Sequence, residues 1–386
     1  MSIIIFIVIL ALLILIHEFG HFIAAKKIGV LVEEFGFGFP PKLFGKKIGE
    51  TEYTINLLPI GGFVKLFGEE YNEASKKKIS PEIKKRAFVS KKPWQKTIVI
   101  IAGVVMNLVL GVGIYYFLLA TNNFKSEPMP VFTDYKFAFG NKESQVIISR
   151  IVKDSPAEKS GVKPGDIITR ISNTQPQENW INVWSSSQLI TLINKSEGKN
   201  VKIEVKNIQD NSMKYVTVVP KYNKELNRAV IGIGLAEIIV LSYDTFTQRL
   251  FAGFLHAYNV VGYNFDGMGF LFKSSFAQKS FEPVSQSMAG FIGIFNIVDE
   301  ILKSSGQKVF INLLNLIAIL SLSLATINIL PFPALDGGRL VFVIWEWITK
   351  KQVNPKFEQY LNVFGFVSLL ALSALIFIND IIKLQH

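Results

Sequence analysis

Four apolar segments, each roughly twenty residues long, set the strongest limit on what this chain can fold into. They cover residues 3–25, 97–120, 310–330 and 360–378. At about 1.5 Å per residue, a helix of that length crosses the roughly 30 Å hydrocarbon layer of a bilayer. Because backbone groups in that layer must be hydrogen-bonded internally, we expect transmembrane helices. The mean hydropathy of +0.34 agrees with a membrane protein and disfavours a soluble enzyme.

The basic residues indicate how these helices are oriented. Lysine and arginine are concentrated in residues 26–96, between the first two apolar segments. A second group flanks the link between the last two segments and consists of Arg339, Lys350, Lys351 and Lys356. Since cytoplasmic loops carry an excess of basic residues, both loops are expected in the cytoplasm and the N-terminus outside. Residues 121–309 would then be extracytoplasmic. The chain has a net charge of +11, but its basic residues lie beside apolar segments and do not form a separate basic domain. We therefore expect no nucleic-acid partner.

The first apolar segment carries the motif H-E-x-x-H at residues 17–21. On a helix this spacing puts His17 and His21 on one face, where they can share one Zn²⁺, with Glu18 placed to deprotonate a zinc-bound water. A signal peptide is the alternative for an apolar N-terminal segment, but a basic start and a small-residue cleavage site are missing. Ionisable residues inside a membrane segment are costly and mark a functional site.

A catalytic zinc site needs a third protein ligand and an open position for water. The chain has no cysteine, and its other histidines are His256 and His386. Asp336 is the best candidate, because prolines 331 and 333 break the third apolar helix and the glycines that follow allow a sharp turn. The first and third segments both run from outside to inside, so Asp336 is predicted to reach the same membrane depth as the two motif histidines.

Residues 128–236 are predicted to form a globular insert. A strand is expected over 146–152, a short helix begins with Ser155 as N-cap and ends at Gly161, and a second strand follows over 167–171. The run S-P-A-x-x-S-G-V-K-P-G-D-I-I, from residue 155, resembles the bacterial PDZ domain. Residues 231–234 would be its closing strand, where such domains hold a peptide C-terminus by strand addition. A steric filter without a ligand is an equally open alternative.

Two further elements complete the predicted organisation. Strands over 51–57 and 62–67 flank a turn at 59–61, and Gly36-Phe37-Gly38 lies upstream as a sheet edge with little side-chain bulk. That edge suits backbone pairing with a substrate strand, although a purely structural hairpin is the alternative. After the insert, Phe246, Leu250 and Phe254 fall on one face of an expected interfacial helix, with the lone His256 at the lipid headgroup level. The expected domains are 1–127, 128–236 and 237–386.

The order of these features resembles the site-2 protease family, and specifically its bacterial regulator-of-sigma-E group. The resemblance rests on H-E-F-G-H, G-F-G with a sheet, the PDZ-like run and N-x-x-P-x-P-x-L-D-G-G at residues 328–338. It implies a polytopic α-helical membrane protein with four transmembrane helices, a small cytoplasmic β-sheet and one extracytoplasmic PDZ domain. It also implies a zinc endopeptidase of the bacterial cytoplasmic membrane that cleaves membrane-spanning segments, such as anti-sigma-factor-like proteins and remnant signal peptides. Asn328 would then hydrogen-bond the substrate backbone.

Some positions depart from the family pattern. Many members have two PDZ domains, and this chain has one PDZ-like run. Ser323 stands where many carry a second asparagine, and residues 103–107 read G-V-V-M-N where relatives often read G-P-x-x-N. Two other functions are weighed: a membrane metal transporter, because intramembrane histidine and aspartate also mark ion paths, and a catalytically silent PDZ scaffold. The transporter reading explains neither Glu18 nor the insert.

Overall fold

The computed structural model contains two compact units. One combines Met1–Leu118 with Gly253–His386, and the other is Leu119–Ala252. We call them the helical unit and the inserted unit. The inserted unit is wider at both ends than the predicted 128–236 domain, whose boundaries stay a prediction. The described residues are 1–69, 80–131, 133, 135–173, 179–207, 212–280, 282–287, 290–304 and 306–384.

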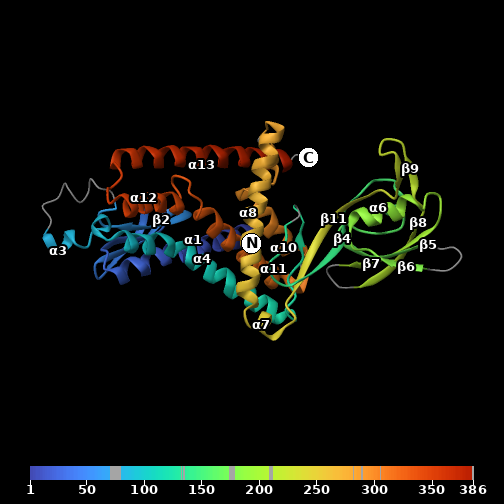
Figure 1. Cartoon of the computed structure of the whole chain (residues 1–386), viewed down its shortest axis with the longest axis horizontal. Coiled ribbons are helices and arrows are strands. Elements are labelled where there is room, and N and C mark those ends of the chain that lie inside the picture. Colours follow the sequence, from blue (N-terminus) through green and yellow to red (C-terminus); the bar gives the residue numbers. More distant parts are fainter. Residues whose placement is uncertain are drawn as a thin grey trace. The chain divides into compact units, whose positions relative to one another are not determined.

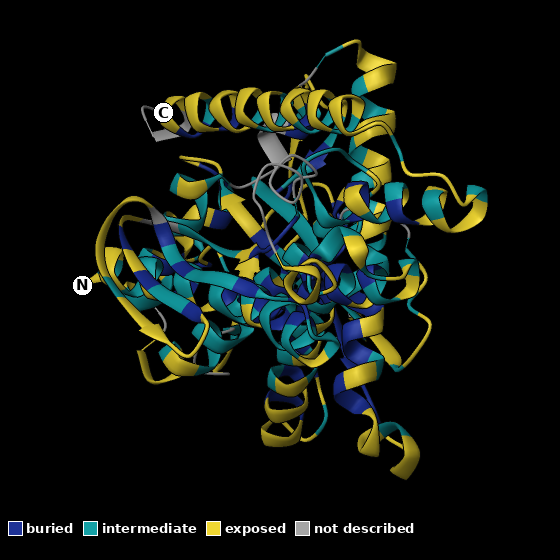
Figure 2. Ribbon diagram, turned by 90° about the vertical axis from the view of Figure 1, so that its left-hand side faces the viewer, coloured by how far each residue is buried: buried dark blue, intermediate teal, exposed yellow. Residues whose placement is uncertain are grey.

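The four apolar segments are helices long and apolar enough to cross a membrane, as the sequence predicts. They are α1 (Ser2–Ile28), α4 (Pro93–Thr121), α11 (Val309–Asn328) and α13 (Pro355–Leu384) (Figure 1). Only 6% of the most apolar window of α13 is buried, and Figure 2 shows exposed residues along most of this helix. Such a surface of large apolar side chains is expected where a helix faces lipid.

Glycines let α4 lie close to both α1 and α11. A Cβ atom on Gly20 of α1 would lie 2.3 Å from the backbone oxygen of Ala102 in α4. On α4 itself, a Cβ atom on Gly111 would lie 2.5 Å from the Leu322 side chain of α11. Backbones can approach this closely in a membrane protein only where small residues face each other. The helix that carries H-E-x-x-H is therefore held tightly against α4.

Shorter helices complete the helical unit. The amphipathic α10 (Phe291–Ser304) buries Val298 in one apolar cluster with Ile9 and Leu13 of α1 and Leu316 of α11. The remaining helices and 3-10 turns are α3 (Pro81–Lys84), η1 (Phe88–Ser90), α8 (Ala252–Gln278), α9 (Glu282–Ser287), η2 (Gly306–Lys308) and α12 (Asp336–Thr349).

A sheet of two long strands, β1 (Val32–Ile48) and β2 (Thr51–Leu66), packs against α1. The ring of Phe22 in α1 contacts Phe35 and Tyr53 of the sheet at centroid distances of 5.2 and 6.0 Å. The strands β1 and β2 reverse at residues 49–50. The chain reverses again across 59–61, where a turn is predicted, but the segments on either side of this turn do not pair with each other. Residues 59–61 instead connect two parts of β2 that pair with opposite sides of the first part of β1.

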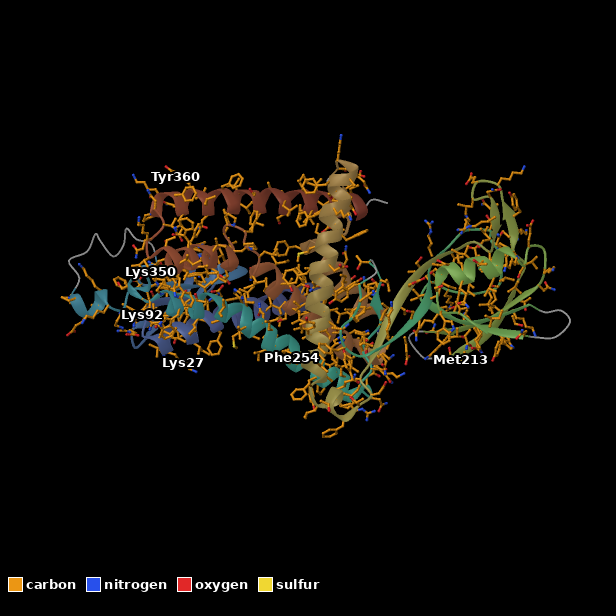
Figure 3. The ribbon with its side chains drawn as sticks, in the orientation of Figure 1. Lys27, Lys92, Met213, Phe254, Lys350 and Tyr360 are labelled. Carbon is orange, nitrogen blue, oxygen red and sulfur yellow. The ribbon has the colours of Figure 1, made fainter. Side chains whose placement is uncertain are left out.

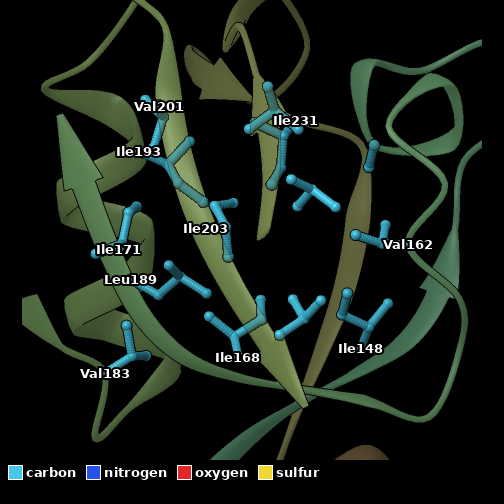
Figure 4. Close-up of a cluster of buried hydrophobic side chains, with 14 of the residues drawn as sticks. Ile148, Val162, Ile168, Ile171, Val183, Leu189, Ile193, Val201, Ile203 and Ile231 are labelled. Atoms are coloured by element: carbon cyan, nitrogen blue, oxygen red, sulfur yellow. The ribbon is translucent and has the colours of Figure 1, made fainter. Parts of the chain in front are cut away.

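The inserted unit contains a sheet with the strand order β3-β11-β4-β5-β7-β8, to which β6 adds beside β5. Two short helices accompany it, and α6 contributes Leu189 and Ile193 to the buried cluster in Figure 4. The bounds are β3 (Met129–Pro130), β4 (Asn141–Ile151), α5 (Pro156–Lys159), β5 (Asp166–Asn173), β6 (Asn179–Asn182), α6 (Ser186–Asn194), β7 (Val201–Asn207), β8 (Met213–Val218), β9 (Lys221–Asn223), β10 (Arg228–Val230), β11 (Ile233–Ser242) and α7 (Phe246–Leu250).

The local signals predicted for this unit are confirmed. The Ser155 side chain accepts a hydrogen bond from Glu158 N at 3.2 Å, as an N-cap should, and Pro156 opens α5. Gly161 follows the helix with a φ of +76°, a value at which a side chain would be strained. The predicted strands at 146–152 and 167–171 lie in β4 and β5.

The helix predicted after the insert is divided in two at Phe251, between α7 and α8. Phe246, Leu250 and Phe254 are exposed, as an interfacial face requires. His256 stays predicted to lie at the lipid headgroup level. Its side chain is buried, its ring lies edge-on to Tyr115 at 4.5 Å, and burial lowers its pKa to about 4. His386 lies outside the described residues.

Candidate metal centre

The three predicted metal ligands lie together. His17 and His21 sit one turn apart on α1, and their Nε2 atoms are 3.2 Å apart. The Oδ2 atom of Asp336 lies 3.0 Å from Nε2 of His17 and 3.3 Å from Nε2 of His21. The three side chains therefore aim one atom each at a common point, although 319 residues separate the first from the last.

The segment before α12 places Asp336 in the first turn of that helix. The helix α11 ends at Asn328, and the chain then folds back so tightly that Cβ atoms on Gly337 and Gly338 would each lie 2.2 Å from a backbone oxygen. A Cβ atom on Gly365 of α13 would lie 2.3 Å from the backbone oxygen of Pro333. Only glycine permits these contacts, so the prolines and glycines of the motif fix where the carboxylate of Asp336 points.

The spacing of the three ligand atoms fits zinc. Ligands at about 2.0–2.1 Å from a tetrahedral Zn²⁺ lie roughly 3.3–3.4 Å from one another. The observed separations are 3.0, 3.2 and 3.3 Å. Two imidazoles with one carboxylate form a known catalytic zinc set, which leaves a fourth position for water. His17, His21 and Asp336 could therefore hold zinc with little rearrangement.

The neighbouring helix α4 contacts both imidazole rings. Nδ1 of His21 donates to the backbone oxygen of Val99 at 2.8 Å, which leaves Nε2 free for a metal. A Cβ atom on Gly103 would lie 2.4 Å from Nε2 of His21 and 2.8 Å from Nε2 of His17, so only glycine leaves room there. The amide nitrogen of Asn107 lies 3.2 Å from Nδ1 of His17. These contacts were not predicted, and the only sequence signal was the G-V-V-M-N pattern.

Glu18 follows His17 on α1 and lies within electrostatic range of both histidines and Asp336. Its Cγ atom would lie 3.3 Å from a Cβ atom on Gly62, so the second part of β2 runs beside it. A glycine at this point lets strand backbone approach the predicted general base.

The predicted free edge at Gly36-Phe37-Gly38 is wrong. Gly36 pairs with Phe63 on one side and with Thr54 on the other, and Phe37 likewise has partners in both parts of β2. The oxygen of Gly38 accepts a hydrogen bond from Asn56 at 3.0 Å. A strand inside a sheet has no unpaired backbone to offer. The outer segments of the described pairing are residues 42–48 and 62–66 instead.

Asn328, the predicted substrate-binding asparagine, is the last residue of α11 and is half-buried. Its side chain makes no hydrogen bond within the described part of the chain, which leaves both the N–H donors and the carbonyl acceptor of its amide for a substrate backbone. Its role stays a prediction.

Ion pairs connect the elements around the centre. Arg339, one turn beyond Asp336 on α12, pairs with Glu69, which follows β2. Lys96 at the start of α4 is buried and pairs with Glu346 of α12 at 2.8 Å. Outside the predicted spans, Arg86 and Lys26 lower the pKa of Glu50 to about 2 and tie the β1–β2 turn to the end of α1.

Comparison with known proteins adds an independent finding. The sequence profile described as Peptidase family M50 matches residues 5–372. Putative zinc metalloproteases from Clostridium perfringens and Clostridium acetobutylicum are each 31% identical to this chain, over 370 and 383 residues. The alignments cover 96% and 99% of this chain and 95% and 97% of the relatives. The regulator of sigma-W protease RasP from Bacillus subtilis is 26% identical over 460 residues, with 99% of each protein covered.

One of the solved structures that match covers part of the chain. It is the PDZ domain of an SdrC-like protein from Listeria monocytogenes, 23% identical, covering 26% of this chain and 93% of that domain. The TM-score of 0.20 is low. The fold of the inserted unit therefore has to be judged from its own strands and helices.

Proposed function

This chain belongs to peptidase family M50, and from that premise we propose that it cleaves the membrane-spanning segments of other proteins. It is a membrane-integral zinc metalloprotease, as the family and the zinc metalloproteases among its relatives establish. The observation that carries the proposal is the ligand cluster of His17, His21 and Asp336 beside Glu18, on a helix apolar enough to cross the bilayer. Peptide hydrolysis at membrane depth needs this combination of a metal site and a base.

In the proposed mechanism, His17, His21 and Asp336 hold Zn²⁺ and Glu18 is the general base. When bound, zinc would lower the pKa of a water molecule and polarise the scissile carbonyl. Glu18 would take a proton from water and give it to the amide nitrogen that leaves. Asn328 hydrogen-bonds the substrate backbone near the scissile bond. The apolar surroundings of α1 limit access of bulk water to these groups.

A transmembrane substrate must unwind before cleavage, since a helix hides its carbonyl groups in its own hydrogen bonds. We place the unwound segment along residues 62–66 of β2, the outer part of the sheet that runs beside Glu18. Pairing to an outer strand supplies backbone hydrogen bonds without demanding a particular sequence. Gly36, Phe37 and Gly38 act indirectly, because a side chain at Gly36 would strike the Phe63 ring at 2.5 Å and displace that outer segment.

The proposed location is the bacterial cytoplasmic membrane, with the metal centre toward the cytoplasm. Lys27, Lys92 and Lys350 gather at one end of the helical unit, where α1 ends, α4 begins and α12 ends (Figure 3). This clustering supports a cytoplasmic placement of that end. The inserted unit is then proposed to be extracytoplasmic.

The inserted unit is proposed to be a PDZ domain that selects substrates. The strand β11 pairs with β4 along its whole length, whereas its pairing with β3 is confined to Ile238 and Ile239 among the described residues. The part from Ile233 to Ala236 is where a peptide C-terminus would add as a strand, since the backbone oxygen of Glu237 already accepts a hydrogen bond from Val131 N at 2.9 Å. Filtering by size, without a peptide, is the second candidate. Deleting residues 128–236 should change which substrates are cut and leave zinc content unchanged.

Proposed substrates are anti-sigma-factor-like membrane proteins and remnant signal peptides. The name of one relative, regulator of sigma-W protease, supports the first class. Purified protein should cleave a single-span model substrate, lose this activity with a zinc chelator and regain it with zinc. A silent scaffold would cleave nothing, and a transporter would move metal ions into vesicles instead. Comparing membrane proteins of cells that carry the wild type or Glu18→Gln would identify accumulated substrates.

A further inference from the structure

Asn107 of α4 is a fully buried polar residue to which the family pattern gives no task at the metal centre. Its Nδ2 lies 3.2 Å from Nδ1 of His17, and its exposed fraction is 0%. Its Oδ1 is buried and has no hydrogen-bond partner among the described residues. Leaving a buried acceptor unpaired costs roughly 1–3 kcal/mol.

The tautomer of His17 supplies that partner. If Nε2 of His17 gives its lone pair to a metal, the neutral ring carries its proton on Nδ1. That Nδ1–H points at the amide of Asn107. The Nδ2 group is a donor and cannot accept it, whereas Oδ1 can. Rotating the amide by 180° exchanges the two atoms, so that Oδ1 accepts from Nδ1–H of His17 and Nδ2 takes the buried place that Oδ1 leaves.

We propose that Asn107 is a positioning residue that accepts a hydrogen bond from Nδ1 of His17 through Oδ1 and so aims Nε2 at zinc. The inference rests on the proposed function only in treating His17 as a zinc ligand. Without metal, the amide takes the opposite orientation: Nδ2 donates to Nδ1, and Nε2–H of His17 donates to Asp336 at 3.0 Å. An amide serves both tautomers, which neither a carboxylate nor a hydrocarbon can do.

The backbone of α4 is held in place for this task. The Oγ atom of Ser321 in α11 donates to the backbone oxygen of Asn107 at 2.8 Å, and both residues are 0% exposed. Val99, Gly103 and Asn107 follow one another at intervals of four residues, on one face of the helix. That face contacts both histidines. The backbone oxygen of Val99 is hydrogen-bonded to His21, the amide of Asn107 is hydrogen-bonded to His17, and Gly103 leaves space for both rings.

The test compares two substitutions of similar size in the purified full-length protein. Asn107→Leu fills the space without an acceptor, and zinc affinity, measured by competition with a chromophoric chelator, should fall about 10–100-fold. Asn107→Asp keeps an acceptor for Nδ1–H and should stay within about threefold of the wild type or bind more tightly. Equal losses in both variants, or wild-type affinity in Asn107→Leu, would overturn the proposal. Zinc affinity is read without a substrate, so a failure here is separable from absence of proteolysis.

Ser321→Ala is the matched control for loosened packing between α4 and α11. It removes the hydrogen bond to the Asn107 backbone and leaves the amide in place, so zinc affinity should change by less than about twofold. A loss as large as that of Asn107→Leu would assign the effect to packing and overturn the proposal.

A measurement on the wild type keeps the proposal testable if a variant does not fold. The chain has only four histidines, so ¹⁵N-histidine NMR of the zinc-loaded protein is tractable. The proton on Nδ1 of His17 should resonate at low field and exchange slowly, as a buried hydrogen-bonded N–H does. An Nδ1 without a proton, or with a rapidly exchanging one, would contradict the proposal.

Discussion

His17 and Asp336 are 319 residues apart in the chain, yet Nε2 of the first lies 3.0 Å from Oδ2 of the second. The contact joins the first membrane helix to the first turn of α12. It predicts that Asp336→Ala will lose zinc as well as proteolysis. The loss of zinc affinity should exceed the roughly 10–100-fold that removing a hydrogen-bond partner of a ligand costs. Asp336→Asn keeps the shape and removes the charge, so its zinc affinity should lie between those of Asp336→Ala and the wild type. Full zinc content in purified Asp336→Ala would place the third ligand elsewhere.

Glu18 is expected to be needed for chemistry and not for metal binding. Glu18→Gln keeps the size of the side chain but cannot take a proton from water. Cleavage of a model transmembrane substrate should fall by about 10²–10⁴-fold, while zinc content stays at that of the wild type. Both are measured on the same purified sample, by gel-based turnover and metal analysis. Turnover equal to the wild type would remove Glu18 from the mechanism.

The long apolar helices and the cluster of His17 and His21 could be predicted because their signals are local. Length and apolarity mark each candidate spanning helix, and the four-residue spacing of His17 and His21 defines one helical face without reference to the rest of the fold. The place of Asp336 in that cluster needed one more step. It followed from the expectation, based on the charge distribution, that the first and third apolar segments run in the same direction.

The sheet and the surroundings of the histidines could not be predicted in the same way. Which strand lies inside a sheet depends on long-range pairing. The sequence around Gly36 does not indicate whether this residue lies at an edge or, as observed, between two partner strands. Likewise, nothing in the sequence near His17 indicates that Asn107, ninety residues away, will face its ring. The burial of His256 was not predicted, because a helix of mixed polarity does not show which of its faces packs against a neighbour.

Stability of the inserted unit is expected to depend on pH through Glu204 of β7. Arg170, and to a lesser degree Thr169, lower the pKa of this buried carboxyl from 4.5 to about 2. A lowered folded-state pKa adds stability above pH 4.5 that is lost as the pH falls from 4.5 toward 2. Because Arg170 is partly exposed, we expect about 1–2 kcal/mol, below the full value of the shift.

Hydrogen exchange of β5 and β7 amides in the full-length protein, corrected for intrinsic rates, measures this loss between pH 6 and pH 3. Glu204→Gln is the control, since its protection should be lower at pH 6 and nearly flat over the acid range. Wild-type protection that does not fall below pH 4.5 would show that the ion pair adds nothing to stability.

Gly103 provides the sharpest test of the space around the ligands. A methyl group at this position would lie 2.4 Å from Nε2 of His21 and 2.7 Å from Cε1 of His17, so one or both rings must move. Ligand distances in a zinc site tolerate changes of only about 0.2 Å, and Gly103→Ala should therefore lower zinc affinity at least about tenfold. Gly113→Ala on the same helix is the matched control, because nothing lies within 4 Å of its would-be Cβ. Both substitutions raise the helix propensity of α4 by up to about 1 kcal/mol, so a loss of zinc confined to Gly103→Ala must come from crowding of the imidazoles. Equal zinc affinity in the two variants, measured by chelator competition, would mean that Gly103 does not define the metal site.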